Sequence, residues 1–132
     1  MTDQEYKSQK KRIQILIDKW ISPLGLRWWR IRFNYFREDR KNGETSYRPL
    51  IGEDGDWKVM FATTCDPYYL TASIDCYLPT ILEADNDEVE ECFLHELMHV
   101  ILSPMHHKAT RKEEELVATN LARAFGYLEE KK

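Results

Sequence analysis

Hydrophobic and polar positions follow regular spacings over most of the chain, and these spacings predict helices and strands. Residues 4–21 carry isoleucine, leucine and tryptophan at helical spacing, opposite lysines and arginines, which predicts an amphipathic helix. Residues 28–36, 57–63 and 70–78 are each predicted as a strand, and the alternation within residues 28–36 predicts one buried face there. Residues 37–56 are polar and contain several glycines, so we expect a long connection there.

The second half of the chain contains its most apolar segment. Residues 87–102 are hydrophobic on nearly every side of a helix and end before Pro104, which predicts a buried central helix. The polar residues 85–88 supply N-cap and first-turn acids for that helix. A last helix is expected over residues 111–128, with Thr110 as its N-cap.

These elements predict one α+β domain over residues 1–132. We expect an N-terminal helix, a small and mostly antiparallel three-stranded sheet, the central helix, and a C-terminal helix packed on it. A hydrophobic fraction of 42% is enough for a core, and no apolar run has the roughly 20 residues of a membrane span. The polar N-terminus and the odd number of cysteines, three, favour a cytoplasmic protein with reduced thiols. The net charge of −4 argues against a general nucleic-acid binder.

The central helix carries His95, Glu96 and His99 in the spacing His-Glu-x-x-His. Residues four apart on a helix lie about 40° apart around the axis, so both imidazoles can face one ion. Glu96 is rotated by about 100° from His95 and can border the ion without binding it. This arrangement lets a zinc-bound water meet a general base. Histidines in an apolar helix also need polar partners, and a metal ion would supply one.

A catalytic zinc usually has three protein ligands and one open position, so a third ligand is needed. The extension of the motif with Gly and a third His at fixed spacing is absent, because Leu102 and Met105 stand at those positions. His106 and His107 are near in sequence but follow a proline in a different register, and they remain candidates.

The start of the last helix offers further ligands in Glu114 and Glu115. Small residues follow Glu115 at helical spacing and would let this helix approach the central one closely: Ala118, Thr119, Ala122 and Gly126. Bulkier residues follow Glu114 at the same spacing. We therefore expect Glu115 as the third ligand, with Glu114 as the second choice and His106 or His107 after it.

His95-Glu96-Leu97-Met98-His99, followed by a helix that carries Glu115, resembles the gluzincin type of zinc metallopeptidase. The chain is similar to small bacterial and phage-encoded zincin-like proteins, and more loosely to the ImmA/IrrE and SprT-like groups. The resemblance implies a zincin-like fold, Zn²⁺ as cofactor, and hydrolysis of a peptide or protein substrate with Glu96 as general base. Gluzincins often have an acidic or amide residue four positions after the ligand glutamate, where this chain has Thr119.

The resemblance also implies that the strand before the central helix is a sheet edge on which the substrate lies as an added strand. That strand would be residues 70–77, with Ala72, Ile74 and Tyr77 as substrate-binding residues. Four side chains are candidates for stabilising the oxyanion: Tyr77, His106, His107 and Arg111.

The small size of the chain supports a second hypothesis. No segment stands out as a separate substrate-binding unit. A non-catalytic zinc-binding module with the same fold, acting in regulation or interaction, would also have this sequence pattern.

Overall fold

The chain is described by a computed structural model, which covers residues 1–41, 50–51, 57–105 and 111–130. The elements in chain order are α1 (Asp3–Trp20), β1 (Arg30–Phe36), β2 (Arg40–Lys41), β3 (Leu50–Ile51), β4 (Trp57–Val59), β5 (Phe61–Asp66), β6 (Thr71–Tyr77), α2 (Leu78–Glu83), α3 (Asn86–Leu102), η1 (Ser103–Met105) and α4 (Arg111–Glu130). The predicted α+β class is confirmed. None of the described helices combines the length and the apolar character that a membrane span requires.

The main sheet is mixed, whereas a mostly antiparallel sheet was expected. Its strand order is β1-β6-β5, with β1 parallel and β5 antiparallel to β6. β6 is therefore the central strand, and β5 is an edge strand. The prediction that residues 70–77 form a sheet edge is wrong, because β6 pairs with β5 on one side and with β1, much earlier in the chain, on the other. Pairing between strands so far apart in the sequence cannot be predicted from the pattern of hydrophobic and polar residues within each strand.

A second small sheet lies where the sequence predicted only a connection. Its strand order is β2-β4-β3, and β2 and β3 fall within residues 37–56. The predicted strand 57–63 is divided at Met60, so that β4 belongs to this second sheet and β5 to the main sheet. Strands of two or three residues are too short to show alternation, which is why the pattern missed them.

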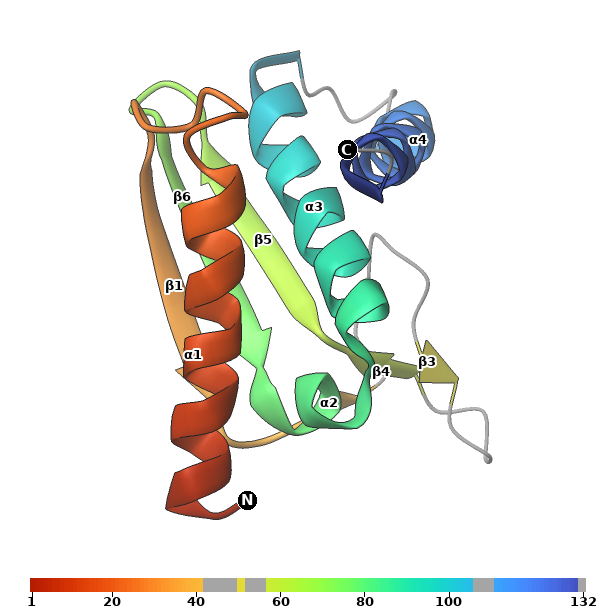
Figure 1. Cartoon of the computed structure of the whole chain (residues 1–132). Coiled ribbons are helices and arrows are strands. Elements are labelled where there is room, and N and C mark those ends of the chain that lie inside the picture. The colour runs from red at the N-terminus through yellow and green to blue at the C-terminus, as the bar shows by residue number, and fades with distance from the viewer. Residues whose placement is uncertain (42–49, 52–56, 106–110, 131–132) are drawn as a thin grey trace.

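Two helices, α1 and α3, lie on the same face of the main sheet (Figure 1). Lys10 of α1 lies over the ring of Tyr35 in β1. Phe93 of α3 packs against Phe33 of β1 and Phe61 of β5, with ring centroids 6.1 and 5.8 Å apart. Alternate strand residues face these helices, and their burial joins α1, α3 and the sheet in one hydrophobic core.

The start of α3 is held to α1 through Arg12. Its guanidinium donates to the carbonyl oxygens of Ile81 and Ala84 and to Oδ1 of Asn86, at 2.7–2.9 Å. These bonds satisfy the last carbonyls of α2, a short helix that follows β6 directly and was not predicted. The side chain of Asp85 accepts from the backbone N–H of Glu88, so the predicted N-cap region of α3 is confirmed.

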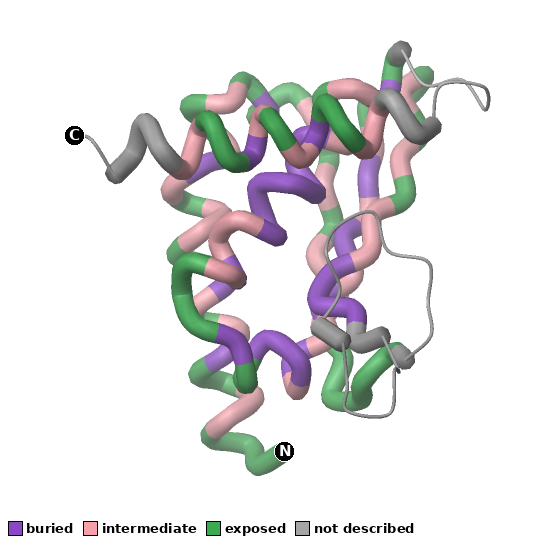
Figure 2. The backbone as a smooth tube through the Cα atoms, turned by 90° about the vertical axis from the view of Figure 1, so that its right-hand side faces the viewer, coloured by how far each residue is buried: buried purple, intermediate pink, exposed green. Residues whose placement is uncertain are grey.

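The C-terminal helix α4 crosses α3, as Figures 1 and 2 show. Ala118 and Ala122 are completely buried, whereas Val117 is 42% exposed. Two of the small residues after Glu115, Ala118 and Ala122, thus face the interior, whereas Thr119 and Gly126 are only half-buried. No neighbouring atom of the described residues lies within 4 Å of the position that a Cβ would take at Gly126, so the predicted close approach does not extend that far. Close approach through alanines brings the first turns of α4 beside the histidines of α3. Thr110, the predicted N-cap, lies outside the described residues.

Candidate metal centre

His95 and His99 point toward one another from successive turns of α3. Their Nε2 atoms are 3.0 Å apart. The His95 side chain is fully buried and that of His99 is 12% exposed. Local helix geometry accounts for this pairing, since residues four apart share a face.

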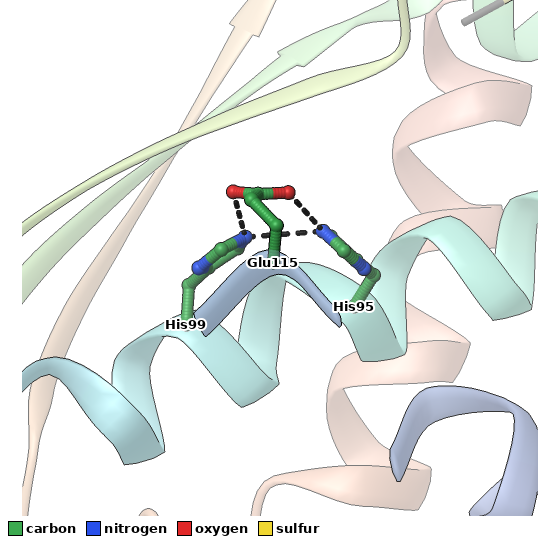
Figure 3. A group of neighbouring side chains, drawn as sticks. All are labelled: His95, His99 and Glu115. Atoms are coloured by element: carbon green, nitrogen blue, oxygen red, sulfur yellow. Dashed lines mark hydrogen bonds and ion pairs between the residues drawn. The ribbon is translucent and has the colours of Figure 1, made fainter. Parts of the chain in front are cut away.

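Glu115 of α4 completes a group of three donors (Figure 3). Its Oε1 lies 3.1 Å from Nε2 of His99, and its Oε2 lies 3.4 Å from Nε2 of His95. Oε2 is buried and accepts no hydrogen bond from the described part of the chain. A buried carboxylate oxygen in this state is costly without a cation. Both histidine nitrogens and this carboxylate therefore converge on one small volume.

The donor set fits a zinc ion. Zinc bonds of about 2.0–2.1 Å in a tetrahedron place ligand atoms roughly 3.3 Å apart. Here the two Nε2 atoms are 3.0 Å apart, Oε1 of Glu115 is 3.1 Å from Nε2 of His99, and Oε2 of Glu115 is 3.4 Å from Nε2 of His95. One ligand atom from each of the three residues can be chosen so that all lie within 4.8 Å of one another. Two imidazoles and one carboxylate are also the ligands of known catalytic zinc sites that keep a fourth position for water. His95, His99 and Glu115 are thus the residues that could hold the metal.

Glu114, the second choice as ligand, lies on the other side of His99. Its Oε1 is 2.8 Å from Nδ1 of His99. A proton on Nδ1 donated to this carboxylate leaves Nε2 with its lone pair toward the metal position. Glu114 therefore orients the imidazole of His99, whereas the neighbouring Glu115 is one of the three potential donors.

Thr119 takes the corresponding place beside His95. Its hydroxyl oxygen is 3.4 Å from Nδ1 of that ring. Thr119 differs from the acidic or amide residue that gluzincins often have at this position. It still places a polar but neutral group, its hydroxyl, beside His95. The Nδ1 atom of His99 thus faces a carboxylate, and that of His95 faces a hydroxyl.

The electrostatics of the group favour a proton on His99 when no metal is present. Burial alone would lower the pKa of His99, but hydrogen bonds with Glu115 and Glu114 and the charge of Glu96 raise it to about 9. Burial likewise opposes the charge on Glu115, yet contacts with His95 and His99 bring its pKa below the usual value. The metal-free group is therefore held together by a charged histidine and two carboxylates.

Zinc binding should release about one proton at pH 7, because the metal must displace the proton of His99. We expect the affinity to rise about tenfold per pH unit between about pH 7 and pH 9. In the metal-free protein, the contacts of charged His99 with Glu115 and Glu114 stabilise the fold. This stabilisation is complete below about pH 6.5 and is lost as the pH rises through about 9. Titration calorimetry in buffers of different ionisation enthalpy measures the proton count. A count near zero at pH 7 would contradict this account.

Glu96 lies next to the three donors but is not one of them. Its side chain is buried, with 3% of its surface exposed, and its Oε2 accepts a hydrogen bond from the hydroxyl of Thr63 in β5. The predicted rotation of Glu96 away from the ligand face is thus observed. Thr63 was not predicted as a site residue, because only the packing of β5 against α3 brings it there.

The expected substrate residues in β6 do not line this site. Ala72 and Ile74 are buried in the core on the helix-covered face of the sheet. Tyr77 points to the opposite face, where its ring stacks on Phe36 at 5.3 Å between centroids. Since strand residues alternate between faces, Tyr77 cannot reach the donors and is also excluded as an oxyanion partner.

The other candidates for the third ligand and for stabilising the oxyanion lie outside what the structure describes. These are His106, His107 and the side chain of Arg111.

No family model, curated protein or solved structure matches this chain.

Proposed function

We propose that the protein is a zinc-dependent metallopeptidase with a minimal zincin-like fold. The observation that carries this proposal is the convergence of His95, His99 and Glu115, at donor separations suited to zinc, beside the buried carboxylate of Glu96. A structural zinc site would need a fourth protein ligand. Among the described residues, the group of potential ligands contains three.

The chemistry divides between the metal and Glu96. Zinc, when bound, would polarise the scissile carbonyl and lower the pKa of a water. Glu96 accepts the proton of that water at its carboxylate and then delivers it to the leaving amine. Glu114 and Thr119 keep the two imidazoles oriented with Nε2 toward the metal position.

The substrate would lie along β5 rather than β6. β5 is the edge of the main sheet that packs beside α3, and in the described chain it pairs with β6 alone. An extended peptide could pair with its free side and so pass close to Glu96. Backbone pairing of this kind selects extended peptide segments with few side-chain requirements, so unstructured proteins are the expected substrate class.

Incubation with an unstructured protein tests the proposal. The zinc-loaded protein should generate new peptide termini, detected by mass spectrometry. A chelator should stop the cleavage, and added zinc should restore it. If zinc-loaded protein leaves such substrates intact, the peptidase proposal fails and a non-catalytic zinc-binding module becomes the better account.

A further inference from the structure

Thr63 belongs to the edge strand β5, and its side chain contacts Glu96 of the site. The hydroxyl of Thr63 donates to Oε2 of Glu96. Its neighbours on the same face of β5, two residues away on each side, also point toward the helices. Phe61 packs on Phe93 of α3, and Cys65 lies against Ser103 of η1. These three alternate side chains of β5 therefore face α3 and η1, and among them Thr63 contacts Glu96.

The strand register fixes where the backbone of Thr63 points. Tyr77 N donates to the carbonyl of Met60 at 2.9 Å, and β5 continues from there in antiparallel register with β6. In such a pair, alternate residues direct both backbone groups toward the partner strand. Those residues are Ala62, Thr64 and Asp66. The N–H and C=O of Thr63 consequently face the free side of β5, where an added peptide strand would pair.

We infer that Thr63 is a positioning residue that couples peptide binding at the β5 edge to the orientation of the Glu96 carboxylate. This inference rests on the proposed peptidase function. A peptide that pairs with the backbone of Thr63 restrains the residue whose hydroxyl holds the general base. The nearby scissile bond and the carboxylate are then aligned by one residue of β5. Glu96 gains a donor for a buried carboxylate oxygen, which keeps the group in one rotamer.

Replacement of Thr63 by valine removes the hydroxyl and keeps the side-chain shape. Thr63→Val should lower kcat by about 10–100-fold, the effect of losing a hydrogen bond to a charged group. KM should change less than about threefold, because the backbone pairing remains. Thr63→Ser retains the hydroxyl and should restore kcat to within about threefold of the wild type.

The neighbouring Thr64 supplies a matched control. It is exposed and its side chain points to the other face of the sheet, so Thr64→Val should leave kcat and KM unchanged. Zinc affinity, measured by competition with a chromophoric chelator, should be equal in the wild type and all three variants. A loss of zinc in Thr63→Val would instead assign Thr63 to the shape of the metal site and overturn the inference.

A second measurement does not depend on turnover. In the metal-free protein, Thr63→Val and Glu96→Ala should each change the melting temperature, and the double variant should differ from the sum of the two shifts. Additive shifts would overturn the contact. Wild-type turnover with an unchanged kcat in Thr63→Val overturns the role of Thr63 alone. Absence of wild-type turnover overturns the proposed function, and the role of Thr63 falls with it.

Discussion

Glu96→Gln should bind zinc as tightly as the wild type and cleave peptides about 10²–10⁴-fold more slowly. Glutamine has the shape of glutamate but cannot take up the proton of the attacking water. Zinc binding should persist because Glu96 is not one of the three donors, which are His95, His99 and Glu115. The hydroxyl of Thr63 can still donate to the amide oxygen of glutamine, so the buried side chain keeps its partner.

Two measurements on the same preparation separate the outcomes for this variant. The zinc content is determined by atomic absorption, and kcat by the rate of new peptide termini. Full zinc content with turnover equal to the wild type would remove Glu96 from the mechanism. Lost zinc would show that the packing of α3 had changed, and Glu96→Asp, which keeps the charge, then serves as the comparison for turnover.

Glu115→Ala should lower the zinc affinity by more than about 100-fold, whereas Glu114→Gln should lower it by roughly 10–100-fold. The first substitution removes a donor that faces both Nε2 atoms. The second keeps a hydrogen-bond acceptor at Nδ1 of His99 and removes only its charge. These two neighbours on one helix thus differ because they approach His99 from opposite sides of its ring.

Competition with a chelator of known affinity gives both values, and circular dichroism of the metal-free variants checks that α4 still packs. If Glu114→Gln weakened zinc binding more than Glu115→Ala, Glu114 would be the ligand and the present assignment would be reversed. Equal and small effects would mean that neither carboxylate binds the metal.

The sequence by itself determined the parts of the site that depend on one helix. Asp85 and Glu88 define the start of α3, and the spacing of His95 and His99 places two imidazoles on one face. These are local effects of capping and of helical periodicity, so they can be worked out from neighbouring residues. The preference for Glu115 also came from periodicity, because small residues follow it at helical spacing; two of them, Ala118 and Ala122, are buried in the structure.

Only the tertiary structure decided which strand borders the site. β1 and β6 pair in parallel across a long stretch of intervening chain, which makes β6 central and leaves β5 at the edge. Strand order is a property of distant pairings, and alternation within a strand contains no information about it. For the same reason, the expectation for Ala72, Ile74 and Tyr77 was wrong, and Thr63 was not foreseen.

The separate roles of Glu114 and Glu115 also depended on packing between helices. Both are acids at the start of α4, and the sequence alone could only rank them. The rotation of α4 about its axis, set by the buried Ala118 and Ala122, directs one carboxylate to Nδ1 and the other to Nε2 of His99. The sequence thus determined that α3 presents two histidines on one face. The contacts of α4 and β5 with α3 decided which residues complete the site, because those contacts join segments far apart in the chain.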